Sequence, residues 1–352
     1  MAAKKFQVSA DGGTTYFTFP GDTASLETVG TNIKDTVFGQ YWESGQTGLL
    51  SWTMNANGFY KGFAGYVAVI KKTGTPVVIT NEATTAVSVP LKIYQITAAA
   101  HQILDPATPV VVKDGATDVT AQVLNIDYMF GIVTFKSTYT VLGAITVTGA
   151  YLPTTPVAKG QSFTLSQTAT VIDTTDFPTA QSNGGYKTHI PGLNNVALEI
   201  MGIYSITNAW LTTVTARTAF VVEITPDGLN ASTFRGLFKA LSEGQAGKVG
   251  ELEVETVKFT NSVPDPSTLP LFANPANWKF TGGSTLSVAI QNSLNAYVQQ
   301  LVYNWNYLYD GTNGRTGQGV ITDISLKGGL DVMNDFTIKV QGSGAIAPVG
   351  TG

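Results

Sequence analysis

The chain contains no cysteine among its 352 residues. Disulfide bonds, thiolate nucleophiles and thiolate metal sites are therefore excluded together, and the composition fits a protein made in a reducing cytoplasm. The two histidines, His101 and His189, lack the spacing of a metal-binding motif, and no serine lies in a Gly-x-Ser-x-Gly elbow. We therefore expect a protein that is not an enzyme and that uses no metal or cofactor.

Charge is also scarce. Lys, Arg, Asp and Glu make up 12% of the residues, against about 25% in an average soluble domain. The net charge of -4 and the lack of a Lys/Arg cluster argue against a protein that grips nucleic acid. No apolar stretch of about 20 residues occurs and the start lacks a secretory pattern, so membrane insertion is not expected. A mean hydropathy of +0.11 without such a stretch indicates a surface largely covered in an obligate assembly.

Strand signals dominate what is present. The 37 glycines and 15 prolines separate short runs rich in Val, Ile, Thr, Phe and Tyr, as in strands joined by turns. We predict a mainly antiparallel β protein with one or two short helices. The helices are expected from Thr97 to Leu104, where three alanines precede Asp105-Pro106, and at about 231–242. The second prediction rests on an apolar stripe at helical spacing, formed by Phe234, Leu237, Phe238 and Leu241.

The region 319–344 has the pattern of a β-hairpin. Two alternating runs flank a turn rich in glycine and short polar residues. The alternation assigns the side chains of the first strand to two opposite faces: Val320, Thr322, Ile324 and Leu326 on one, and Ile321, Asp323, Ser325 and Lys327 on the other. A separate group of strand runs fills about 73–153, and Asp114-Gly115 is expected to form a hairpin turn between two of them.

The C-terminal hairpin closes on Gly342-Ser343-Gly344 and resembles the closing hairpin of the tail tube proteins of long-tailed bacteriophages. Asp-Thr-Thr-Asp-Phe at 173–177, followed by Ile-Pro-Gly-Leu at 190–193 and an alternating strand, is similar to a signature of the same family. The run 126–131 is similar to a motif of phage structural proteins. The resemblance implies β-sandwich or half-barrel domains that complete a β-barrel only in an oligomeric ring. It implies a structural virion protein, the major tail tube subunit.

A faint internal similarity links the two halves of the chain. Residues 32–38 and the strand that follows them resemble residues 171–177 and their following strand, with Asp35 and Asp173 at equivalent positions. The first copy lacks the proline of the Ile-Pro-Gly-Leu motif. The similarity suggests that the tube domain has been duplicated within the chain.

Duplication predicts two tube-like domains, 1–160 and 161–352, with about 73–153 as an insertion on the outside of the tube. Three chains would then form a pseudo-hexameric ring, whereas a single tube domain would require six chains, and we predict the trimer. Rings would stack into a helical assembly that forms a hollow conduit for DNA ejection.

The family resemblance also implies the partners. These are other copies of the chain within and between rings, the tail terminator, tape-measure and distal tail proteins, and phage DNA that passes through the lumen without specific binding. The expected location is the tail of the virion, after synthesis in the cytoplasm of the host bacterium.

Acidic residues alternate in one short stretch. Glu251, Glu253 and Glu255 would project from one face of a strand while Leu252 and Val254 enter the core. This pattern fits an ordinary solvated strand face, and it also fits a lumen wall that repels DNA phosphates. Further acidic candidates for the lumen are Glu199 and Asp323.

An aromatic strip gives the alternative function. Tyr303, Trp305, Tyr307 and Tyr309 would share one strand face. Such a strip can bury a barrel wall or fill a seam between subunits, and Tyr and Trp are common at interfaces. It can also serve as a sugar-binding platform, which would make the protein a β-rich adhesin or carbohydrate-binding module.

Overall fold

The structure is a computed structural model that describes residues 4–34, 45–60, 70–157, 160–204, 210–227, 231–248, 251–282, 284, 286–329 and 334–350. These residues form antiparallel β-sheets with three α-helices, which confirms the predicted fold class. They divide into two compact units. Unit 1 comprises Met1–Gly62, Ser162–Val196 and Thr285–Gly352, and unit 2 comprises Phe63–Gln161 and Ala197–Ser284. Each unit thus draws on both halves of the sequence, and the tandem domains 1–160 and 161–352 stay a prediction.

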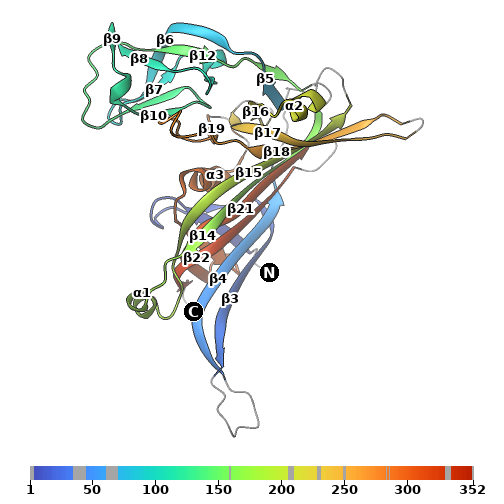
Figure 1. Ribbon diagram of the computed structural model, residues 1–352. Coiled ribbons are helices and arrows are strands. Elements are labelled where there is room, and N and C mark those ends of the chain that lie inside the picture. The colour runs from blue at the N-terminus through green and yellow to red at the C-terminus, as the bar shows by residue number, and fades with distance from the viewer. Residues whose placement is uncertain are drawn as a thin grey trace. The chain divides into compact units, whose positions relative to one another are not determined.

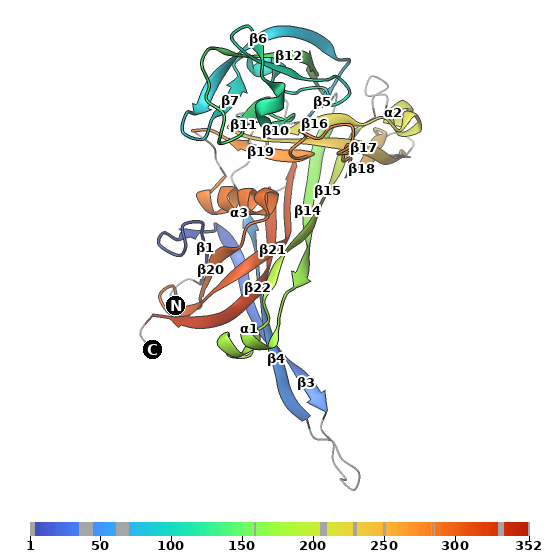
Figure 2. The same ribbon diagram turned by 60° about the vertical axis from the view of Figure 1, so that its left-hand side comes forward.

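The sheet of unit 1 is built around the C-terminal hairpin, which is longer than predicted. Strand β21 pairs with β22 and, on its other edge, with β14 and β20; β22 pairs with β4, and β4 with β3. Beyond β20 the sheet continues through β1 to β2. Figures 1 and 2 show β3 and β4 as a long two-stranded ribbon that runs away from the other strands of this unit. The strand bounds are β1 (Lys5–Ser9), β2 (Phe17–Thr18), β3 (Gly21–Lys34), β4 (Gly45–Phe59), β14 (Gly160–Asp173), β20 (Tyr303–Leu308), β21 (Gly314–Gly329) and β22 (Asp335–Val349).

The predicted alternation along β21 fails at one point. The register with β22 shifts between Ile321, which pairs with Val340, and Asp323, which pairs with Lys339. An extra residue in one strand changes the face taken by those that follow. As a result Val320 and Ile321 are both 2% exposed, although the sequence pattern placed them on opposite faces.

The motif at 173–177 forms a turn that caps α1 (Phe177–Ser182). Asp176 is the N-cap and accepts a hydrogen bond from the Thr179 amide at 2.7 Å. Asp173 accepts the Thr175 amide at 2.9 Å and lies 3.1 Å from Lys187. The motif therefore has a local structural role. It ends β14 and starts helix α1, which leads to β15 (His189–Ile203).

Helix α3 (Val288–Gln299) packs on the sheet of unit 1. Ser287 caps its start, and Gln300 ends it in the left-handed conformation with a φ of 54°. The Tyr297 hydroxyl lies 3.0 Å from the Thr168 carbonyl and 2.8 Å from the Asn195 carbonyl. These contacts fix the helix to β14 and β15.

The closing Gly-Ser-Gly motif makes room for a buried tryptophan. Trp52 is 1% exposed, and its indole nitrogen donates a hydrogen bond to the Gly344 carbonyl at 3.0 Å. A Cβ at Gly342 would overlap the indole ring, and Gly344 has a φ of +84°. The first glycine is thus required for space and the second for its backbone conformation.

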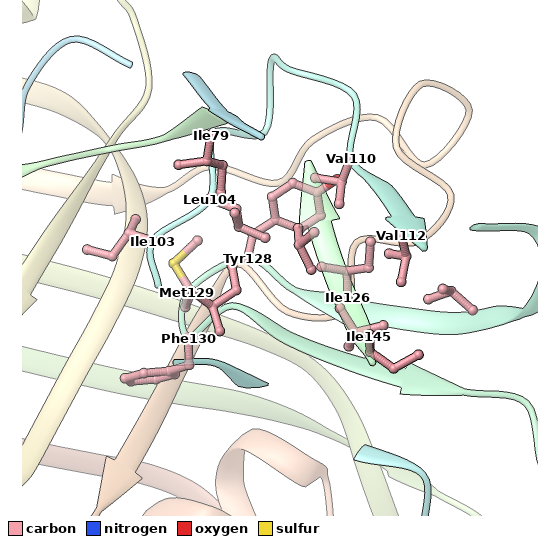
Figure 3. Packing of buried hydrophobic residues seen from close by; sticks show 14 of the residues in the cluster. Ile79, Ile103, Leu104, Val110, Val112, Ile126, Tyr128, Met129, Phe130 and Ile145 are labelled. Carbon is pink, nitrogen blue, oxygen red and sulfur yellow. The ribbon is translucent and has the colours of Figure 1, made fainter. Parts of the chain in front are cut away.

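Unit 2 contains a seven-stranded sheet in the order β10-β11-β7-β6-β12-β8-β9. It spans the segment predicted to have strands of its own, and the turn after Asp114 joins β8 to β9 with Gly115 at a φ of +61°, as predicted. Its core cluster includes the side chains of Leu104, Tyr128 and Met129, which lie close together in Figure 3. The bounds are β6 (Val77–Ser88), β7 (Ile93–Ile96), β8 (Val111–Asp114), β9 (Thr117–Asp118), β10 (Val123–Asp127), β11 (Ile132–Phe135) and β12 (Ile145–Tyr151), with short 3-10 turns η1 (Ala99–His101) and η2 (Thr120–Gln122).

The other strands of unit 2 pair in the order β13-β5-β16-β17-β18-β15, with β19 also on β17. Their side chains join the same core, since Val221 of β16 and Leu237 of β17 belong to the cluster of the seven-stranded sheet. The bounds are β5 (Ile70–Thr73), β13 (Thr154–Pro156), β16 (Phe220–Ile224), β17 (Ser232–Ala246), β18 (Val254–Asn261), β19 (Ala276–Phe280) and α2 (Trp210–Ala216).

The helix predicted at 231–242 is wrong, because this segment is strand β17. Phe234 and Phe238 lie on one face at 0% exposure, while Leu237 is buried on the opposite face at 4%. Burial of both faces removes the two-residue period and leaves apolar residues at helix-like spacing. Leu241, the last residue of the apparent stripe, is 62% exposed and lies where the register with β18 shifts.

The helix predicted from Thr97 to Leu104 is also wrong apart from one 3-10 turn at Ala99–His101. Ile103 and Leu104 are buried in the core at 2% and 0% exposure, and Leu104 forms a β-bridge with Tyr151. Tertiary packing of these two residues therefore overrides the helix propensity of the alanines.

Candidate functional site

The outer edge of β3 is the first candidate for an assembly surface. The strand pairs with β4 along its length, and in the part of the chain that the structure describes no strand pairs with its other edge. Its side chains are exposed apart from two half-buried ones, and Val29 and Ile33 are 50% and 57% exposed. The strand has no proline, and its charged residues are Asp22, Glu27 and Lys34. A long, unprotected edge of this kind promotes pairing with another chain.

The solvent face of the unit 1 sheet carries mainly hydroxyl and amide groups. Strand pairing aligns these groups in rows across β14, β21, β22 and β4. One row consists of Ser166, Ser325, Thr337 and Asn57, and the next of Thr168, Asp323, Lys339 and Asn55. All of these side chains are half-buried or exposed. The face is therefore polar, and the two charges in these rows, Asp323 and Lys339, have opposite signs.

Asp323 and Glu199 each face a lysine on the neighbouring strand. The Asp323 carboxylate lies 3.5 Å from Lys339 Nζ, and the Glu199 carboxylate lies 3.6 Å from Lys258 Nζ. All four side chains are at least 27% exposed. Neither acidic residue carries an uncompensated charge, which the sequence did not reveal because strand register is set by tertiary pairing.

The three alternating glutamates do not share a solvated strand face, so this prediction is wrong. Strand β18 begins at Val254, and Glu251 and Glu253 precede it. Glu255 is 4% exposed and faces inward, whereas Leu252 is 68% exposed. The pairing of β18 with β15 and β17 puts Glu255 on the buried face with Val257. A lumen position for Glu251 and Glu253 stays a prediction.

Glu255 lies in a small region of buried charge in unit 2. The Lys72 ammonium sits 4.5 Å from the centre of the Trp210 ring. Burial lowers the pKa of Lys72, and the nearby charge of Glu255 partly opposes this effect. The cation is thus held between an aromatic face and a carboxylate.

The aromatic strip does not form a continuous exposed platform. Trp305 is 0% exposed and stacks on Phe6 and Phe19 at ring distances of 5.5 and 6.2 Å. Its indole nitrogen donates to the Gly319 carbonyl at 3.1 Å. Tyr303 and Tyr307 are half-buried, and Tyr309 beyond the end of β20 is 54% exposed. The central residue of the strip therefore belongs to the core of the chain itself.

A buried ion cluster in unit 2 was missed by sequence reasoning. Glu223 accepts hydrogen bonds from Lys71 Nζ and Arg235 Nε, each at 2.8 Å. Arg235 also donates to the Met129 carbonyl at 2.9 Å and lies 4.8 Å from the Phe130 ring centre. The sequence does contain a feature that could have revealed the cluster. One charged residue stands within each of two apolar runs, Phe-Val-Val-Glu-Ile and Thr-Phe-Arg-Gly-Leu-Phe.

The motif at 126–131 forms a buried turn next to this cluster. The Asp127 carboxylate accepts hydrogen bonds from the Met129 and Phe130 amides at 2.8 and 3.2 Å, and from Asn277 at 2.7 Å. Burial raises the pKa of Asp127 despite these hydrogen bonds. Gly131 completes the turn with a φ of +59°. In this chain the motif holds the core of unit 2.

The ion cluster gives a pH-dependent stability. Burial alone raises the pKa of Glu223, but Arg235 and Lys71 outweigh it and hold the pKa below the ordinary value of 4.5. A carboxyl group with a lowered folded pKa stabilises the fold above its unfolded pKa, and this contribution is lost as pH falls through the folded pKa. We expect the unfolding free energy lost in Glu223→Gln to be greatest near neutral pH and to shrink below 4.5. Urea unfolding of both proteins over a pH series tests this, and a difference that grows in acid would contradict it.

The described residues form no cluster of metal ligands. None of their His, Asp and Glu side chains gather in groups of three or more that could hold a metal ion. A groove of about 650 Å³ in unit 2 is lined by apolar side chains and by residues of both charges, among them Arg217, Lys239 and Asp265. None of the helices described is long and apolar enough to cross a membrane.

Comparisons with known proteins give structural likenesses but no sequence match. No family model matches the chain, and no curated protein sequence matches it. Among solved structures, it is similar to a chain in the tail of an empty gene transfer agent (GTA) particle with C6 symmetry, at 15% identity and a TM-score of 0.29. The match covers 37% of this chain and 87% of that chain. A likeness at this level does not establish a family.

Proposed function

We propose that the protein is a structural component of a phage-like tail, and specifically the major tail tube subunit. The observation that carries the proposal is the outer edge of β3, a strand of 14 residues, with which no strand of the described part of the chain pairs. An edge of this length without proline is expected to be completed by another chain. The 12% content of charged residues and the resemblance of the closing hairpin to phage tube proteins support the same conclusion.

In the proposed assembly, chains pair through their sheet edges and form a ring, and rings stack through unlike faces into an open-ended tube. Three chains form a ring if each supplies two tube domains, and six if each supplies one. The tail terminator, tape-measure and distal tail proteins would contact the ends and the interior of such a tube. The assembled protein would be part of the virion tail.

The solvent face of the unit 1 sheet suits a conduit for DNA. Binding to phosphates needs uncompensated Lys or Arg, but Lys339 on this face lies 3.5 Å from the Asp323 carboxylate. The hydroxyl and amide groups of these rows can form weak hydrogen bonds with DNA but carry no charge of their own. DNA would therefore pass such a surface without lasting attachment, and a strongly negative wall is not required.

The alternative function as a carbohydrate-binding module has less support. Its expected platform depends on Trp305, and the indole of this residue is buried against Phe6 and Phe19. Glycan binding by a monomer is therefore the outcome that would contradict the tube proposal.

Electron microscopy of the concentrated protein tests the proposal. We expect hollow tubes. Rotational averaging of their end-on views gives the number of chains in each ring. Val29→Lys on the β3 edge is expected to abolish the tubes, because a lysine on an edge strand opposes pairing with another strand. The matched control is Val87→Lys on β6, since Val29 and Val87 are 50% and 58% exposed. Monomers that never polymerise, or equal loss of tubes in both variants, would contradict the role given to β3.

A further inference from the structure

Strand β17 also has an open edge. Along its first part it has strands on both edges, because β16 pairs with 234–238 and β19 pairs with 232–236. From Ser242 to Ala246 it pairs with β18, and no other strand among the described residues pairs with this part. Four of these five residues are exposed and Glu243 is half-buried. The outer edge of Ser242–Ala246, the β17 edge, is thus available to another chain.

The β3 edge and the β17 edge match in character. Each belongs to a strand whose named pairings are all antiparallel. Each has large exposed apolar side chains at or beside the open stretch, Val29 and Ile33 on β3 and Leu241 on β17. The charged residues are Asp22, Glu27 and Lys34 on β3 and Glu243 on the open stretch of β17. Neither edge has a proline, and the single lysine, Lys34, is the last residue of β3.

The two edges differ in sequence and lie in different units, which decides how copies would join. If β3 paired with β3 of a second copy, the contact would be two-fold and would end at a dimer, with both β17 edges still open. If β3 paired with the β17 edge of a second copy, every chain would use both edges at once. Such a heterologous contact repeats from chain to chain, and it closes into a ring when the rotation between neighbours returns to the first chain.

We infer that the β3 edge of one chain pairs, antiparallel, with the β17 edge of the next chain. This inference rests on the proposed function, because it names the partner that completes the sheet in the ring. It gives each chain two different assembly edges, one donated by unit 1 and one by unit 2. Backbone hydrogen bonds supply the contact, and the adjoining exposed apolar side chains become covered.

Single-cysteine chains test the inference, since the chain has no cysteine of its own. On β3, Thr28→Cys and Val29→Cys place the thiol on opposite faces of the strand. On β17, Ser242→Cys and Gln245→Cys likewise place it on opposite faces. A β3 variant and a β17 variant are mixed in equal amounts, assembled, and treated with a short bis-maleimide, which tolerates a small offset in register. Electron microscopy of the same samples shows whether tubes have formed.

We expect covalent dimers in the mixed samples at roughly a hundredfold or more above the control Ser137→Cys, because paired strands hold two thiols at a millimolar effective concentration. Ser137 is exposed and lies on neither edge. Dimers in a sample of one β3 variant alone would overturn the inference in favour of a two-fold contact. Tubes without mixed dimers in any of the four combinations would overturn the inference and leave the proposed function standing. Absence of both tubes and dimers would overturn the two together.

Discussion

Replacing Glu223 by alanine is expected to lower the free energy of unfolding by about 3–5 kcal/mol. Glu223 is 4% exposed and is the shared partner of Lys71 and Arg235, each at 2.8 Å. Its removal leaves the Arg235 guanidinium, 11% exposed, without its carboxylate in the interior of unit 2. An uncompensated buried charge costs far more than the ion pair contributes. Urea unfolding followed by intrinsic tryptophan fluorescence measures the loss.

Glu199→Ala is the matched control for this prediction. The Glu199–Lys258 pair is also cross-strand, but its side chains are 45% and 60% exposed. Water replaces the lost partner there, so we expect a change below about 1 kcal/mol. Similar losses for Glu223→Ala and Glu199→Ala would show that the buried cluster has no special weight in the fold.

Trp305→Ala is expected to lower the free energy of unfolding by about 3–5 kcal/mol, because it removes a fully buried indole and leaves a cavity. The substitution also removes the stacking on Phe6 and Phe19 and the hydrogen bond to the Gly319 carbonyl. These losses affect the strands β1, β20 and β21 of unit 1. Thermal and urea unfolding of the purified variant measure the change.

Two variants sharpen this experiment. Trp305→Phe retains an aromatic ring next to Phe6 and Phe19 and should recover part of the lost stability. Tyr309→Ala, at a 54% exposed position just beyond β20, should change stability by less than about 0.5 kcal/mol. If the Trp305→Ala protein is as stable as the unmodified chain, Trp305 is not a core residue, and the aromatic strip is again a candidate binding surface.

Local patterns predicted the elements whose structure depends on near neighbours. The C-terminal hairpin, the Asp114-Gly115 turn and the mainly antiparallel β class were all accessible from alternation and turn chemistry. The same patterns failed where a contact from elsewhere in the chain intervened. At β17 the burial of Leu237 on one face and Phe238 on the other produced a helical spacing in a strand.

The candidate site was less predictable than the fold. The sequence identified Glu199 and Asp323 as acidic surface positions, but the opposing Lys258 and Lys339 come from other strands and depend on register. It also grouped Glu255 with Glu251 and Glu253, although strand pairing turns Glu255 inward. A one-residue change in register reverses the face of every side chain, and sequence alternation does not specify which face is covered.

Composition and short-range periodicity are properties of the chain alone, and they were enough to predict the β class of this protein, its lack of thiol chemistry and its low charge. Strand pairing and burial, in contrast, join residues far apart in sequence. The structure was therefore needed to find which strand edges stay open, which acidic residues have a lysine opposite, and that Trp305 and Glu223 are buried. The outer edges of β3 and of Ser242–Ala246 in β17 are open because no further strand among the described residues pairs with them.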